Sequence, residues 1–135
     1  MITKLFLAYV LTTLVFFGLD FLWIAVVMKK FYKNGIGHLM AENFKYIPII
    51  VFYFLYTLGL FFFAIYPGYQ KESIATAAIL GSFLGLFAYT TYDLSNMGTL
   101  KDWPLRVTLI DILWGVIASS AVSSVGCVIL QVIYS

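Results

Sequence analysis

The sequence predicts an all-α membrane protein, a four-transmembrane-helix antiparallel bundle forming a single integral membrane domain over residues 1–135. Hydrophobic residues make up 63% of the chain and charged residues only 10%, against roughly 45–50% and 25% in an average soluble domain. The apolar residues gather in four stretches, each near the roughly 20 residues that cross a bilayer. Helices are expected because hydrocarbon offers the backbone no hydrogen-bond partners, so each segment must satisfy its own.

The first expected span covers residues 5–28. Lys4 precedes it as in a signal peptide, but the apolar run is too long and lacks a small-residue cleavage site, so we expect a retained span. The other three spans are expected over residues 47–66, 74–93 and 107–133. A chain of this length holds one such domain, which excludes a multi-domain enzyme.

Polar residues and helix breakers separate the spans. The connections cover residues 29–46, a short turn around Pro67 and Gly68, and residues 94–106 with Gly98 and Pro104. Aromatic residues near the span ends, Tyr32 among them, are expected to anchor the helices at the headgroup level.

The basic residues are distributed unevenly between the two sides. Lys4 and Lys71 are alone on one side, whereas the first and third connections are flanked by Lys29, Lys30, Lys33, Lys45, Lys101 and Arg106. The positive-inside tendency places these connections in the cytoplasm and both termini on the non-cytoplasmic side. With a net charge of +2 and no basic run between polar residues, nucleic-acid binding is excluded as a function.

Three aspartates lie inside or at the edge of the spans. Asp20 is in the first and Asp111 in the fourth, while Asp93 closes the third. Counted from the expected cytoplasmic ends, at about 5.4 Å per helical turn, all three fall in the cytoplasmic third of the membrane. A carboxylate at such depth costs several kcal/mol unless it is paired, hydrated or neutralised.

Two of these acids share a short motif with tryptophan. Asp20 precedes Trp23 and Asp111 precedes Trp114 by three residues, so each acid and indole share one helix face. The first and fourth helices are antiparallel, and as neighbours they would bring Asp20 to the depth of Trp114 and Asp111 to that of Trp23. The spacing therefore suggests two reciprocal carboxylate–indole contacts.

The acids admit two interpretations. They are structural, bonded to Tyr, Trp, Ser and Thr across helices, or at least one is a proton carrier, a general acid or base, or a cation ligand. The candidate polar intramembrane site comprises Asp20, Trp23, His38, Asp93, Asn96, Asp111 and Trp114. His38 could shuttle protons or bind a metal with Asp93 or Asp111, but a lone interfacial histidine is more often simply solvated. The sequence shows no metal-ligand spacing, so we assign no metal site, and whether a metal binds stays open.

Small and aromatic residues add weaker signals. Gly81 and Gly85 with Gly115 and Ala118 allow close helix packing, either within the chain or in a homo-oligomer. Serines of the fourth span could line a polar path, although such serines also bond their own helix carbonyls. The aromatic second span could cradle an acyl or isoprenoid chain, although lipid-facing bulk alone accounts for its composition.

Three segments carry a family resemblance: residues 89–96 read YTTYDLSN, residues 99–104 read TLKDWP and residues 111–115 read DILWG. With Asp20, Trp23 and the segment 31–38, they make the sequence similar, nearly end to end, to the bacterial membrane proteins of domain-of-unknown-function family 2177 (DUF2177). Ser95 departs from the threonine common there. The resemblance implies a multi-pass protein of the bacterial inner (cytoplasmic) membrane and brings no activity.

We therefore predict a small integral membrane protein, in contact with the lipid bilayer, that binds or processes a lipid-like small molecule at the aspartate site near the cytoplasmic face. The first alternative is an oligomeric proton-coupled transporter or channel with Asp20 as carrier. The second is a structural or partner-binding subunit. Because no nucleophile or cofactor motif is present, whether the protein is an enzyme stays open, as do its catalytic residues and any cofactor.

Overall fold

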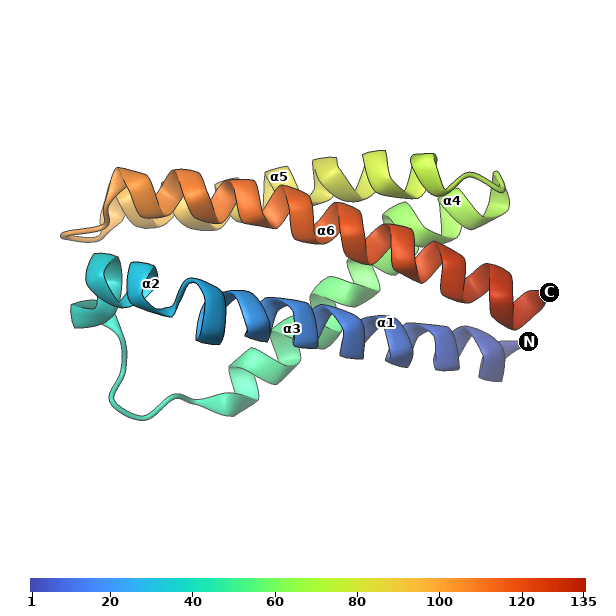
Figure 1. The fold of residues 1–135 in the computed structure, drawn as a ribbon, viewed down its shortest axis with the longest axis horizontal. Helices are drawn as coiled ribbons and strands as arrows, with labels where there is room; N and C mark the ends of the chain where they lie inside the picture. The colour runs from blue at the N-terminus through green and yellow to red at the C-terminus, as the bar shows by residue number, and fades with distance from the viewer.

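The computed structural model describes residues 1–135 and is built from helices alone (Figure 1). Helix α1, Ile2–Leu22, continues into a π-helical turn, Trp23–Val27, and is followed by α2, Lys29–Ile36, and a 3-10 turn, Gly37–Leu39. Helix α3, Tyr46–Leu60, passes through a second π-helical segment, Phe61–Ile65, into α4, Tyr66–Gln70. The remaining helices are α5, Ile74–Thr99, and α6, Leu105–Tyr134.

Four continuous helical segments are long and apolar enough to cross a membrane. They are Ile2–Val27, Tyr46–Gln70, Ile74–Thr99 and Leu105–Tyr134. This confirms the predicted bundle of four spans. Two boundaries differ from the prediction. The second span continues through Pro67 and Gly68 to Gln70, so the expected turn at these residues is helical and the chain turns at residues 71–73 instead. Helix α5 ends at Thr99, so Asp93 does not close the helix but lies about one and a half turns inside it. The polar residues after position 93 continue the helix because no proline interrupts it, and Leu100 is the first residue with an extended backbone.

Helices α5 and α6 form the closest pair, with small residues where their backbones meet. A Cβ atom at Gly81 would collide with Ser123, and one at Gly85 would collide with the Gly115 carbonyl and with Ser119. The small residues of the third and fourth spans therefore pack against each other within one chain. Their antiparallel register, 81 with 123 and 85 with 119, brings position 93 opposite position 111.

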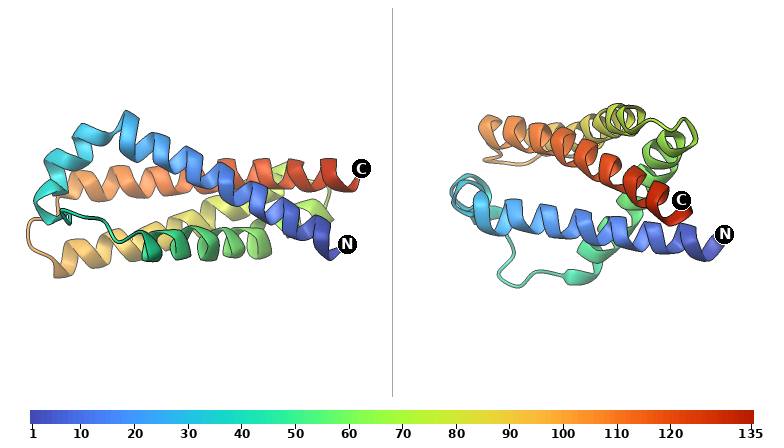
Figure 2. Two further views of the ribbon diagram at one scale, coloured as in Figure 1. Left: turned by 90° about the horizontal axis from the view of Figure 1, so that it is seen from below. Right: turned by 45° about the vertical axis from the view of Figure 1, so that its right-hand side comes forward.

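Helix α3 diverges from α5 along half of its length. Figures 1 and 2 show it starting apart from α5 and reaching it only near the chain termini, through Phe61–Ile65 and α4. There the approach is close, since a Cβ at Gly68 would collide with Ala77. The main buried cluster, which includes Phe16, Leu60 and Leu130, fills the bundle among α1, α3 and α6. Toward the opposite end the splay of α3 leaves α5 partly uncovered.

The two ends of the bundle differ in charge. Helix α2 and the connections after it and after α5 lie at one end, whereas the chain termini and the turn between α4 and α5 lie at the other (Figure 1). The first end, which we call the basic end, carries Lys29, Lys30, Lys33, Lys45, Lys101 and Arg106.

Candidate functional site

Asp20 joins three helices through its carboxyl group. It is buried on α1, with 3% of its surface exposed, and accepts hydrogen bonds from the Trp114 indole at 2.8 Å and from the Tyr53 hydroxyl. Trp114 belongs to α6 and Tyr53 to α3. The first of the two carboxylate–indole contacts suggested by the sequence is therefore present, and both Asp20 oxygens have a donor.

The second suggested contact is replaced by a bridge. The Trp23 indole donates to the Tyr32 hydroxyl at 3.0 Å, and that hydroxyl donates to Asp111 Oδ1 at 2.9 Å. The direct bond between Trp23 and Asp111 is absent because α2 folds back toward α6 and inserts Tyr32 between them. Close packing fixes this return, since a Cβ at Gly35 of α2 would collide with Val107.

Tyr32 is thus a site residue that the sequence placed only as an interfacial anchor. Its side chain is buried, and this burial together with the neighbouring Asp111 carboxylate raises the pKa of its phenol above the ordinary value. Tyr32 therefore stays protonated at neutral pH and can donate to Asp111. The sequence did place Tyr32 on the same side of the membrane as the acids, but tyrosines are common at the membrane interface, so this position alone did not mark it as a site residue.

The two indoles lie against each other between these bonds. The rings of Trp23 and Trp114 are parallel, with 4.2 Å between centroids and 1° between planes. Each indole N–H has an oxygen partner, as buried tryptophans require. Asp20 and Asp111 are consequently linked through one continuous array of bonded and stacked side chains.

Asp93 differs from Asp20 in having no donor. It is fully buried, with 0% exposure, and neither carboxyl oxygen is hydrogen-bonded to a donor of the protein. The register of α5 and α6 places Asp93 opposite Asp111, so that the two carboxyl groups interact. Two carboxyl groups can bond to each other only through a shared proton. We call Asp93 and Asp111 the acid pair.

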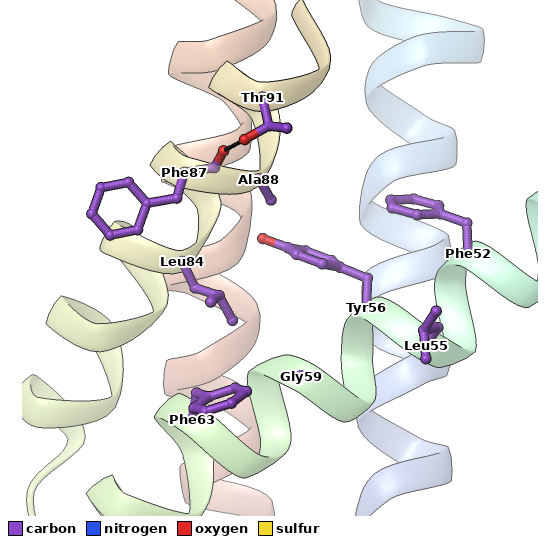
Figure 3. Close-up of a pocket in the computed structure, with 9 residues that line it drawn as sticks. All are labelled: Phe52, Leu55, Tyr56, Gly59, Phe63, Leu84, Phe87, Ala88 and Thr91. Atoms are coloured by element: carbon purple, nitrogen blue, oxygen red, sulfur yellow. Dashed lines mark hydrogen bonds between the residues drawn. The ribbon is translucent and has the colours of Figure 1, made fainter.

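A lateral groove separates the diverging parts of α3 and α5. Its volume is about 500 Å³ (Figure 3), and it is lined by Phe52, Leu55, Tyr56, Gly59, Phe63, Leu84, Phe87, Ala88 and Thr91. In Figure 3 the ring of Tyr56 points from α3 toward α5, whereas that of Phe87 turns outward. Phe63 and Phe87 are 60% and 62% exposed, so the walls face the surrounding lipid.

Two tyrosines stand between the groove and the acids. The Tyr56 hydroxyl is hydrogen-bonded to Ser119 Oγ at 2.6 Å, and its ring meets that of Tyr89 edge-on at 6.2 Å. Tyr89 lies over Gly115, where any Cβ would collide with its ring, and its phenol is within electrostatic range of Asp20 and Asp111. The spacing of these tyrosines in sequence gave no indication of this arrangement.

Of the other two predicted site residues, His38 lies away from the acid pair and Asn96 lies on the same helix as Asp93. His38 Nε2 lies 3.7 Å from Asp102 Oδ2, and both side chains are exposed, at 52% and 76%. Its carboxylate partner is therefore neither Asp93 nor Asp111, because the 3-10 turn carrying His38 lies at the basic end beside the α5–α6 connection. Asn96 is partly buried one turn beyond Asp93. No cluster of three or more His, Cys, Asp or Glu side chains has a geometry that could hold a metal ion.

Comparison with known proteins gives one match. The family model described as "Predicted membrane protein (DUF2177)" matches residues 5–128. No curated protein and no solved structure matches the chain.

Proposed function

Since this chain belongs to the family of predicted membrane proteins DUF2177, we propose a function exercised within the bilayer: the binding of a lipid-like amphiphile. Its tail would lie in the groove between α3 and α5. Its polar head would approach the acid pair, Asp93 and Asp111. The family description assigns no activity, so the proposal depends on the geometry of the site.

The groove is the observation that carries the proposal. Its walls are aromatic and aliphatic, and at about 500 Å³ it falls in the 300–1,000 Å³ range of ligand pockets. Four helices selected only for close packing would contact one another along their full lengths, whereas α3 diverges from α5 toward the basic end. An apolar trough that opens to lipid and is separated from the acids by Tyr56 and Tyr89 suits the tail of a molecule whose head passes these tyrosines.

We propose different roles for the three aspartates. Asp20, with Trp114 and Tyr53 as donors, holds α1, α3 and α6 together. Asp111 is positioned by Tyr32 and shares a proton with Asp93, which has no other partner. The acid pair would receive the head group, and proton transfer is the chemistry that it could support.

The orientation of the protein is also a proposal. The concentration of lysine and arginine at one end favours that end as cytoplasmic, in a bacterial inner membrane. The acid pair and the wide end of the groove would then lie toward the cytoplasm, and both termini would lie outside.

The proposal can be tested by filling the groove. A Cβ at Gly59 would meet only Leu84 Cδ2, at 4.0 Å, so the side chain of a Gly59→Leu variant can enter the groove without a backbone collision. Gly18 on α1 is exposed with nothing within 4 Å, and Gly18→Leu is the matched control. We expect the protein purified from its native membrane to retain a defined amphiphile, measured by mass spectrometry of extracted lipids. Gly59→Leu should lose it and Gly18→Leu should keep it.

Two results would contradict the proposal. One is a co-purified lipid mixture that simply mirrors the bulk membrane. The other is a defined lipid whose amount is the same in the Gly59→Leu and Gly18→Leu variants. Both variants should elute as folded protein of the same size, which separates loss of ligand from loss of fold.

A second candidate function is proton-coupled transport, in an oligomer because four helices enclose little room. Buried hydroxyls favour it: Thr57 Oγ1 and Ser123 Oγ have no hydrogen-bond partner, and they lie deeper along the bundle than the acid pair. In reconstituted vesicles an Asp93→Asn variant should then abolish pH-driven flux. Absence of flux in the wild-type protein, with ligand retention intact, would leave lipid binding as the function.

A further inference from the structure

The head group of the bound molecule can be assigned to a chemical class. We infer that the acid pair recognises a cationic amine, so that the ligand is an amphiphile with an ammonium head. The inference rests on the proposed function and makes it more specific. It follows from the contacts of Asp93 and Asp111 and from the positions of the basic residues.

The acid pair has no positive partner in the protein. The groups that interact with it are themselves acidic or neutral: Tyr32 from α2, Asp20 from α1, and Tyr89 and Tyr92 from α5. Every lysine and arginine near the basic end is exposed, and the Arg106 guanidinium lies 6.0 Å from the centroid of the Phe31 ring. The only contact between a basic and an acidic side chain is that of His38 with Asp102. A positive charge at the acid pair must therefore come from a ligand.

Asp20 provides an internal comparison. At similar depth its carboxyl accepts two bonds from the protein, from Tyr53 and Trp114, which shows how this chain satisfies a buried acid structurally. Asp93 has no such donor although it is fully buried. A buried acceptor without a donor costs about 1–3 kcal/mol, and more if it is charged. A proton shared with Asp111 satisfies only one of its two oxygens, and a ligand that supplies a donor to the other explains why the acid is retained.

An ammonium group fits the pair in donor number and in charge. It has three N–H donors and no acceptor, so it can bond to both carboxyl groups at once. One proton shared between Asp93 and Asp111 leaves the pair with a single negative charge, which one ammonium balances. A divalent metal ion fits less well, because Ca²⁺ takes 6–8 oxygen ligands and the third nearby carboxylate, that of Asp20, is already bonded to Tyr53 and Trp114.

The inference is tested with probes that share a tail and differ in the head. Dodecylamine and dodecanol are titrated against the protein in phosphatidylcholine nanodiscs, with empty nanodiscs subtracted. We expect the wild-type protein to bind dodecylamine at least about tenfold more tightly, the factor that corresponds to about 1.4 kcal/mol. Ethylamine, which has the head without the tail, should bind much more weakly than dodecylamine.

Variants identify the groups responsible for the preference. The double variant Asp93→Asn with Asp111→Asn keeps the shape of both side chains, and its two amides can bond to each other. We expect it to lose the preference for the amine while its affinity for dodecanol is unchanged. Asp102→Asn removes an exposed carboxylate at the same end and should keep the preference, which excludes a general effect of surface charge.

The possible failures are distinguishable. Equal affinity of the wild-type protein for the two probes, with both weakened by Gly59→Leu, would overturn the amine assignment and leave the proposed function intact. Binding of both probes that is unaffected by Gly59→Leu would overturn the proposed function and this inference with it. Tight binding of ethylamine would show that the head is recognised without the groove and would refute an amphiphile. Because the wild-type comparison alone can refute the inference, the test does not depend on how well the double variant folds.

Discussion

Replacing Asp20 by alanine should destabilise the protein by about 2–4 kcal/mol. The side chain accepts two hydrogen bonds, from Trp114 on α6 and Tyr53 on α3, and both donors would be left buried without a partner. Interhelical hydrogen bonds in membranes are worth about 0.6–2 kcal/mol, and those to charged groups in soluble proteins about 1.5–3 kcal/mol. Release of the buried carboxylate offsets part of the loss. Asp20→Asn keeps one acceptor oxygen, so we expect about half the effect.

The measurement is the free energy of unfolding in bicelles, by steric trapping or by titration with a denaturing detergent. A double-mutant cycle isolates the bond to Tyr53: because Tyr53→Phe removes the same interaction from the other side, the combined variant should be less destabilised than the sum of the single ones by about 1 kcal/mol. Leu14→Ala, at a lipid-exposed position on the same helix, is the control and should have a small effect.

Three outcomes would refute this account of Asp20. A loss below about 0.5 kcal/mol would mean that the two bonds contribute little. Strict additivity with Tyr53→Phe would mean that the two side chains do not interact as the structure has them. A variant that keeps its stability but loses ligand would assign Asp20 to the binding site instead of to the framework.

Two further predictions concern α2 and the membrane orientation. Tyr32→Phe removes two hydrogen bonds at once. Amide hydrogen exchange in α2 should therefore accelerate about tenfold or more, while exchange in α5 stays unchanged. Equal exchange rates in α2 of the variant and of the wild-type protein would contradict the bridge. In a chain in which the buried Cys127 is replaced by alanine, an impermeant maleimide should label Glu72→Cys on intact cells but Asp102→Cys only after permeabilisation, and the reverse pattern would invert the orientation.

The sequence was sufficient for the spans and for one contact between them. The length of each apolar segment and the need of its backbone for hydrogen bonds within the segment do not depend on the other helices. The four helices could therefore be located without knowledge of their packing. Depth is also local, because it follows from the rise per residue, and this is why the match of Asp20 with Trp114 was predictable from an antiparallel arrangement. The predicted contact between Trp23 and Asp111 was wrong because α2, which lies outside both spans, folds back and places Tyr32 between the two side chains.

What the sequence by itself determined, then, is an all-helical membrane protein with its acids toward one end. Only the tertiary structure decided which acid is satisfied and which is not. Rotation about each helix axis and tilt between helices depend on contacts among distant residues. The packing of Gly81 and Gly85 against α6 turns Asp93 toward Asp111, and the tilt of α3 opens the groove between α3 and α5 (Figure 3).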